Sequence, residues 1–169
     1  MLSSTGSSRR SLVCEPLPDE AYVEVHVRSA RLTDLDAAVR ILARDAEEGE
    51  RRHDVDYLRT LLFVPSATVA VAELERRVVG VGVLAIRPSV RSGPFVGIVD
   101  ELGIAQAPTL DAAERRGVAD AIVEHLVTSA RNKGCTRVEV TEPLASAEPP
   151  LWKRLGFASR GRMLGRTIG

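Results

Sequence analysis

One segment near the middle of the chain, residues 95–141, carries most of the structural information; it reads FVGIVDELGIAQAPTLDAAERRGVADAIVEHLVTSARNKGCTRVEVT. Its valine-rich beginning predicts a strand from about Phe95 to Ile104. After a polar stretch at residues 105–116, which predicts a loop, apolar residues recur with helical spacing at Val118, Ala119, Ile122, Val123, Leu126, Val127 and Ala130. Gly134 stands where helices commonly end, and residues 137–141 alternate like a strand. A strand, a helix and a strand in this order predict a parallel strand pair.

The residues before this segment predict an N-terminal strand, two helices and a hairpin. Residues 22–27 alternate like a half-buried strand. A helix should start at Thr33, where Asp36 is placed for a variant of the capping box, and a short second helix should end at Pro65. The charged run 45–56 predicts a solvated loop or a helix end.

Residues 67–74 and 78–86 are rich in valine and predict an antiparallel hairpin around the charged turn 75–77. After residue 141, Glu148-Pro149-Pro150 predicts a short helix that Gly156 ends, and residues 157–168 predict a last hairpin. The element order predicts an α/β protein of the mixed, α+β kind. Residues 1–20 are polar and predict a disordered leader, which leaves residues 21–169 as one domain.

The composition excludes several classes of function. The chain has 169 residues, 44% of them hydrophobic, and 23 basic residues balance 23 acidic ones. A neutral total argues against general nucleic-acid or membrane-surface binding. Cys14 and Cys135 are expected to be thiols, and no metal is expected because the histidines and cysteines lack the spacing of metal ligands. No apolar run reaches the length of a signal peptide or a membrane span, so a cytoplasmic location is expected.

The start of the long predicted helix is a candidate phosphate site. A helix N-terminus presents unpaired N–H groups, and small residues such as Gly117 and Ala119 let a phosphate approach them closely. Arg115 and Arg116 can add charge-assisted hydrogen bonds. The alternative interpretation, a polar loop that merely enters a helix, stays open because a short glycine motif is common.

Four motifs resemble the GNAT superfamily of N-acetyltransferases over about residues 22–169. Leu102-Gly103-Ile104 is similar to the Leu-x-Val end of the family's fourth strand. Residues 114–119, Glu-Arg-Arg-Gly-Val-Ala, are similar to its Gln/Arg-x-x-Gly-x-Gly/Ala phosphate loop. Residues 152–157, Trp-Lys-Arg-Leu-Gly-Phe, are similar to its Tyr-x-x-x-Gly-Phe signature, and residues 27–35 to its first strand and helix start.

The resemblance implies a mostly antiparallel sheet with a central parallel strand pair that splays into a V-shaped gap. It implies that acetyl-CoA binds in this gap, with its pantetheine arm on the main chain of Leu102, Gly103 and Ile104. It places the diphosphate on the N–H groups of Arg115, Arg116, Gly117, Val118 and Ala119. The acetyl group would pass directly to an amine of a small molecule or protein, and a homodimer is compatible with the family.

A transfer to an amine needs a base that removes the ammonium proton, and Asp100 and Glu101 are the candidates. A regular strand points them to opposite faces, so only one would reach the gap unless a bulge intervenes. Asp100 lies two residues before Leu102, so a regular strand points both to the same face, and Asp100 is therefore the nearer match to the family's basic carboxylate. Each of the two is equally explained as a solvated or helix-capping carboxylate.

The chain also departs from the family pattern. Trp152 replaces the usual tyrosine, which protonates the departing thiolate, and is interpreted as a packing residue. Glu114 puts a negative charge at the first position of the phosphate loop, and Ala145 replaces a frequent asparagine. A non-catalytic module of the same fold, used for binding or interaction, is therefore the alternative to an enzyme.

Overall fold

The structure is a computed structural model that describes residues 25–43, 48–90, 93–106 and 110–159. Five strands form one sheet in chain order: β1 (His26–Ser29), β2 (Ala67–Leu74), β3 (Arg77–Ser89), β4 (Gly93–Ile104) and β5 (Cys135–Val140). The first four pair antiparallel, and β5 runs parallel to β4. The predicted mixed, mostly antiparallel sheet with a parallel pair is therefore confirmed.

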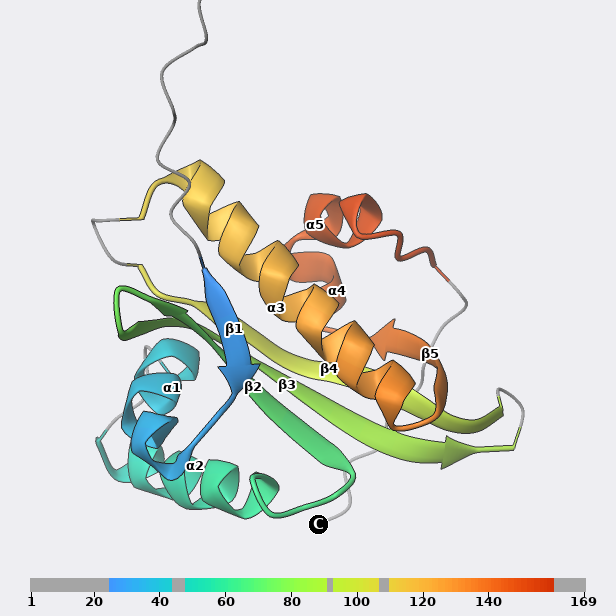
Figure 1. The fold of residues 1–169 in the computed structure, drawn as a ribbon, viewed down its shortest axis with the longest axis horizontal. Coiled ribbons are helices and arrows are strands. Elements are labelled where there is room, and N and C mark those ends of the chain that lie inside the picture. The colour runs from blue at the N-terminus through green and yellow to red at the C-terminus, as the bar shows by residue number, and fades with distance from the viewer. Residues whose placement is uncertain (1–24, 44–47, 91–92, 107–109, 160–169) are drawn as a thin grey trace, which may run out of the picture.

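Helices cover both faces of this sheet (Figure 1). They are the 3-10 helix η1 (Leu32–Asp34) and the α-helices α1 (Leu35–Leu42), α2 (Glu48–Leu61), α3 (Ala112–Asn132), α4 (Leu144–Ala147) and α5 (Pro149–Arg154). Because side chains alternate along a strand, Val69 and Val71 pack under α1 and α2, whereas Ala70 and Ala72 pack under α3. The apolar residues of the hairpin thus contribute to two hydrophobic cores, one on each face of the sheet.

Glycines in β3 bring α3 close to the sheet. A Cβ atom at Gly82 would lie 2.5 Å from Cγ2 of Ile122, and one at Gly80 would lie 2.7 Å from Cδ1 of the same residue. A side chain at either position would collide with Ile122 of α3, so that the Ile122 side chain or the helix would have to shift. Small residues on this face therefore fix the height of α3 above β3, and with it the position of the helix start.

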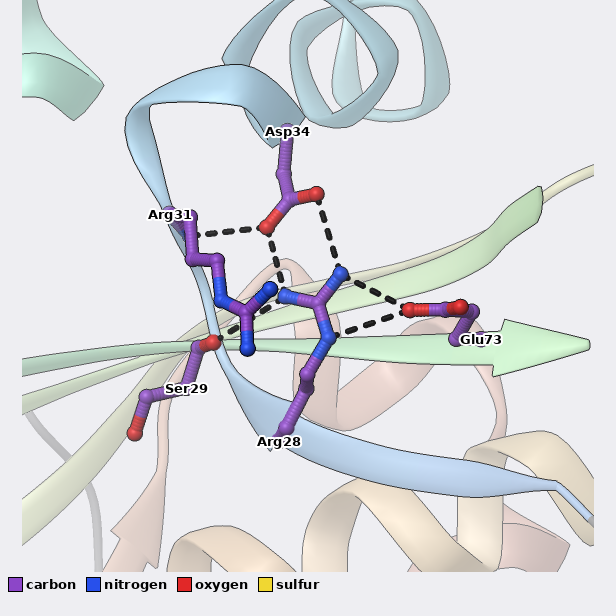
Figure 2. A network of polar contacts seen from close by, with 5 residues as sticks. All are labelled: Arg28, Ser29, Arg31, Asp34 and Glu73. Carbon is purple, nitrogen blue, oxygen red and sulfur yellow. Dashed lines mark hydrogen bonds and ion pairs between the residues drawn. The ribbon is translucent and has the colours of Figure 1, made fainter. Parts of the chain in front are cut away.

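The N-terminal strand is tied to the first helix by a partly buried ion network, which Figure 2 shows. The guanidinium of Arg28 donates to both carboxylate oxygens of Asp34, at 2.7 and 3.1 Å, and to Glu73 at 2.8 Å. The Asp34 carboxylate also accepts from the main-chain N–H of Arg31 at 2.7 Å. These bonds, above all those from Arg28, lower the pKa of Asp34, which is only 6% exposed.

Several predicted boundaries are wrong. The capping carboxylate belongs to Asp34 rather than Asp36, since η1 starts at Leu32, before the predicted helix start. Most of the charged run 45–56 lies in α2, because an amphipathic helix needs only a few inward residues, such as Leu58, to bury. The hairpin turn comprises two residues with left-handed φ angles, Glu75 and Arg76, so that residue 77 already belongs to β3.

Several predictions for the two ends of the chain concern residues outside the described part of the structure. The predicted leader, residues 1–20, and most of the predicted C-terminal hairpin lie outside the described residues, as does the first part of the predicted first strand. The short helix after Glu148 is confirmed as α5, and Gly156 follows it with a left-handed φ of 81°. None of the helices in the described part of the chain is long and apolar enough to span a membrane.

Candidate active site

A cavity of about 950 Å³ opens where the end of β4 meets the start of α3. Its walls come from four places: the C-terminal end of α1, the last four residues of β4, the first two turns of α3, and helices α4 and α5. The predicted site residues that line it are Glu101, Leu102, Gly103, Ile104, Arg115, Arg116 and Ala119. The fold thus brings together most of the residues that the sequence motifs single out.

The two parallel strands separate at this cavity. Their pairing runs from Phe95 opposite Cys135 to Val99 opposite Val140, and β4 then continues to Ile104 beside β3. The N–H of Ala105 donates to Val79 of β3 at 2.8 Å. Because main-chain groups alternate sides along a strand, those of Leu102 and Ile104 face away from β3. This edge faces the cavity and has no strand partner among the described residues.

A β-bulge decides which of the two acidic residues reaches the cavity. Val83 pairs with Glu101 and Leu84 pairs with Val99, so Asp100 is an extra residue on β4. The bulge breaks the regular alternation that favoured Asp100. Both residues are exposed, but Glu101 is part of the described cavity lining and Asp100 is not. The preference for Asp100 from strand parity is therefore not supported by the geometry.

The surroundings of Glu101 favour its protonated form. Loss of hydrating water at the cavity wall raises the pKa of Glu101, and the negative charges of Asp100 and Asp54 raise it further. The side chain still reaches solvent, so protons can exchange with water. A carboxylate with a raised pKa is a stronger base, which suits proton abstraction near neutral pH.

The start of α3 differs from the prediction of a loop up to Arg116. The helix begins at Ala112, and Asp111 caps it by accepting from the N–H groups of Ala113 at 2.6 Å and Glu114 at 2.8 Å. The Glu114 carboxylate accepts in turn from the N–H of Asp111 at 2.7 Å, which completes a capping box. The loop prediction is wrong because this Asp-x-x-Glu signature starts the helix earlier.

The earlier helix start changes the role of the predicted phosphate-binding residues. Within a helix, the N–H groups of residues 116–119 donate to carbonyls four residues back. Val118 is fully buried in the core, and Gly117 is exposed with open space around its Cα. Neither lines the cavity, whereas Arg115, Arg116 and Ala119 do.

Trp152 forms part of the cavity wall and of the core behind it. It is 5% exposed, and its ring meets that of Phe157 edge to face at 5.4 Å between centroids. Its Nε1–H donates to the carbonyl of Leu144 at 3.0 Å. The interpretation of Trp152 as a packing residue is confirmed. The wall from α4 was not predicted, since residues 144–147 carry no strong helix signal.

A family model described as the acetyltransferase (GNAT) family matches residues 35–157. The chain belongs to this family. No curated protein matches it. The resemblance implied a gap between two parallel strands, and the structure has it: β4 separates from β5, and the cavity lies beside this point. Among the described residues, no group of three or more His, Cys, Asp or Glu is placed to hold a metal ion.

Solved structures share this GNAT fold at low sequence identity. An aminoglycoside N-acetyltransferase, AAC(6')-Iy in complex with CoA, is 18% identical with a TM-score of 0.69, and the match covers 86% of this chain and 95% of that one. A ribosomal-protein-alanine N-acetyltransferase from Brucella melitensis biovar Abortus 2308 is 20% identical with a TM-score of 0.67, covering 86% and 100%. A predicted acetyltransferase with acetyl-CoA from Clostridium acetobutylicum is 17% identical with a TM-score of 0.66, covering 85% and 96%.

Proposed function

We propose that this chain is an acetyl-CoA-dependent N-acetyltransferase, which transfers an acetyl group directly to an amine of a small molecule or protein. One observation carries the proposal: a single cavity combines the unpaired edge of β4, the carboxylate of Glu101 and two arginines at the start of α3. Family membership supports the reaction, and similar folds have been solved with CoA or acetyl-CoA.

The shape and chemistry of the cavity fit acetyl-CoA as the co-substrate. The main-chain groups of Leu102 and Ile104 can pair with the amides of a pantetheine arm much as a neighbouring strand would. Arg115 and Arg116 supply positive charge where the phosphates need it. When bound, acetyl-CoA supplies the acetyl group as an activated thioester.

Glu101 is the residue that we assign to proton transfer. An acceptor amine is mostly an ammonium ion near neutral pH and cannot attack until it loses a proton. The Glu101 carboxylate, directly or through a water molecule, takes that proton. Trp152 cannot act as the acid, because its N–H already donates to Leu144 and an indole has no useful acidity. The departing thiolate therefore takes its proton from solvent.

The alternative, a non-catalytic module of the same fold, is favoured by one observation. The N–H groups of residues 113 and 114 at the start of α3 donate to the Asp111 carboxylate, and the N–H of Arg115 donates to the Asp111 carbonyl. If no other group held the phosphates, acetyl-CoA would bind poorly. Titration calorimetry with acetyl-CoA separates the two functions, because a binding module without cofactor use should give no heat at millimolar concentration.

The enzymatic proposal is tested by thiol release from acetyl-CoA with a panel of primary amines. E101Q should lower the rate about a hundredfold, a typical loss for a general base. D100N is the matched comparison, since Asp100 is a neighbouring acid outside the described cavity lining; it should keep most of the rate, and the loss of its charge should only move the acidic limb of the pH–rate profile to lower pH. Equal rates for E101Q and the unmodified protein would contradict the role of Glu101, and the absence of turnover with every amine class would favour the binding module.

A further inference from the structure

One face of the sheet carries Glu101 and, further along the strands, a group of charged side chains. Side chains at every second position of a strand point to the same face, and residues directly opposite each other on paired strands share a face. Val83 of β3 packs under α1 and α2 and pairs with Glu101, so both residues belong to the face that these helices cover. Arg87 lies four positions after Val83 on the same strand and therefore on the same face.

Strand pairing continues this face from β3 to β5. Arg87 lies opposite Val96 of β4, which in turn lies opposite Arg137 of β5. Glu139 lies in the next row toward Glu101, opposite Ile98. Helices α1 and α2 pack against β2 and β3, and Figure 1 shows them away from β5. The two arginines and Glu139 therefore form a charged cluster beside these helices, on the face that carries the base.

The charged cluster of Arg87, Arg137 and Glu139 has an excess of positive charge. Both arginines donate to the Glu139 carboxylate, Arg87 at 3.1 Å. Each guanidinium has five N–H donors, and the described contacts use one from each. The Nε–H of Arg137 is shielded from solvent and has no hydrogen-bond partner among the described residues. A single carboxylate shared by two guanidiniums therefore leaves positive charge and donor capacity for a further anion.

The charged cluster is accessible and lies near the base. The side chains of Arg87 and Arg137 are 44% and 37% exposed. Without the extra residue of the bulge, Ile98 and Glu101 are two steps apart along β4, and β5 lies one strand spacing to the side, so the Cα atoms of Glu139 and Glu101 are about 7–10 Å apart. A molecule with its amine at Glu101 that extends along the sheet toward β5 therefore brings its far end to the two arginines.

We propose that the acceptor is a small molecule with a carboxylate about 7–10 Å from its reactive amine, and that Arg87 and Arg137 bind this carboxylate. This inference rests on the proposed function and names its acceptor class. The chemical step is the one already assigned: the amine gives its proton to Glu101, its nitrogen bonds to the acetyl carbon, the C–S bond breaks, and the thiolate takes a proton from solvent. A guanidinium can bind a carboxylate through two parallel hydrogen bonds, which orients the amine toward Glu101.

The test compares three acceptors in the thiol-release assay with acetyl-CoA: 6-aminohexanoate, hexylamine and 1,6-diaminohexane. They share a chain of the same number of carbons and differ at the end remote from the reacting amine, which is a carboxylate, a methyl group or an ammonium group. The value of kcat/KM should be highest for 6-aminohexanoate. R87A and R137A should each raise its KM about tenfold, the loss expected for one charge-assisted contact, and should leave the KM of hexylamine unchanged. R77A is the matched control, since Arg77 is exposed at the start of the same strand as Arg87 but on the other face.

The other outcomes separate this inference from the proposed function. If the unmodified protein uses hexylamine or 1,6-diaminohexane as well as 6-aminohexanoate, the inference fails and the proposed function stands. If R87A and R137A lower the rate with hexylamine as much as the rate with 6-aminohexanoate, the arginines support the fold rather than the acceptor, and the inference again fails alone. If no primary amine releases the thiol, the proposed function fails and the inference fails with it.

Discussion

Replacing Gly117 with alanine should stabilise the protein. Gly117 lies in the second turn of α3, is exposed, and a Cβ atom there would meet nothing within 4 Å. Alanine is favoured over glycine inside a helix by about 1 kcal/mol, partly because glycine leaves the unfolded chain more freedom. For a chain of this length, about 1 kcal/mol corresponds to a rise in Tm of about 2–4 °C. Calorimetric melting, supported by urea unfolding, measures the change.

Gly82→Ala is the control with the opposite sign. The new methyl group would lie 2.5 Å from Cγ2 of Ile122, and overpacking of this kind costs about 1–3 kcal/mol. If Gly117→Ala lowers the Tm instead, residue 117 does not adopt a helical conformation in solution. Such a result would mean that residues 114–119 form the family's phosphate loop in solution, and it would contradict a helix that starts at the Asp111 cap.

Three further predictions concern charge and hydrogen bonding. D54N should lower the pKa of Glu101, because it removes a nearby negative charge. The acidic limb of the pH–rate profile should therefore move to lower pH. An unmoved limb would contradict the role of Glu101 as the base. D34N should cost about 1.5–3 kcal/mol at pH 7. Because folding lowers the pKa of Asp34 from its usual 3.8, that difference should shrink as the pH falls below about 4, which urea unfolding at several pH values can check. W152F should cost about 1 kcal/mol of unfolding free energy by leaving the carbonyl of Leu144 unpaired, and a cost near zero would show that water replaces the bond.

The sheet could be predicted from the sequence because its physical signal is local. Valines at alternating positions in residues 67–86 indicated the hairpin, and the structure pairs Val69 with Val83 and Val71 with Val81. The helix after β4 was equally clear, since Ile122 and Leu126 recur with helical spacing and both are fully buried. In these elements, local preference and tertiary packing favour the same structure.

The start of α3 shows where local signals compete. Asp111 and Glu114 form a capping signature, whereas Gly117, in the second turn of the helix, suggested the family's phosphate loop. Both signals are present in the sequence, and the helix start depends on which set of hydrogen bonds stabilises the chain more. In the structure the capping box satisfies the free N–H groups within the chain, and the glycine lies inside the helix.

Which of the two carboxylates reaches the cavity could not be predicted from the sequence, because it depends on the number of residues that each of two paired strands contributes. Between the pairs Leu84–Val99 and Gly80–Ile104, β4 has one residue more than β3. No local pattern in β4 reveals this difference, since it arises only when the two strands pair. The bulge brings Glu101 to the cavity and keeps Asp100 out of its lining, just where β4 leaves β5. One extra residue thus selects the carboxylate at the point where the sheet opens for a ligand, and the comparison of E101Q with D100N tests this selection directly.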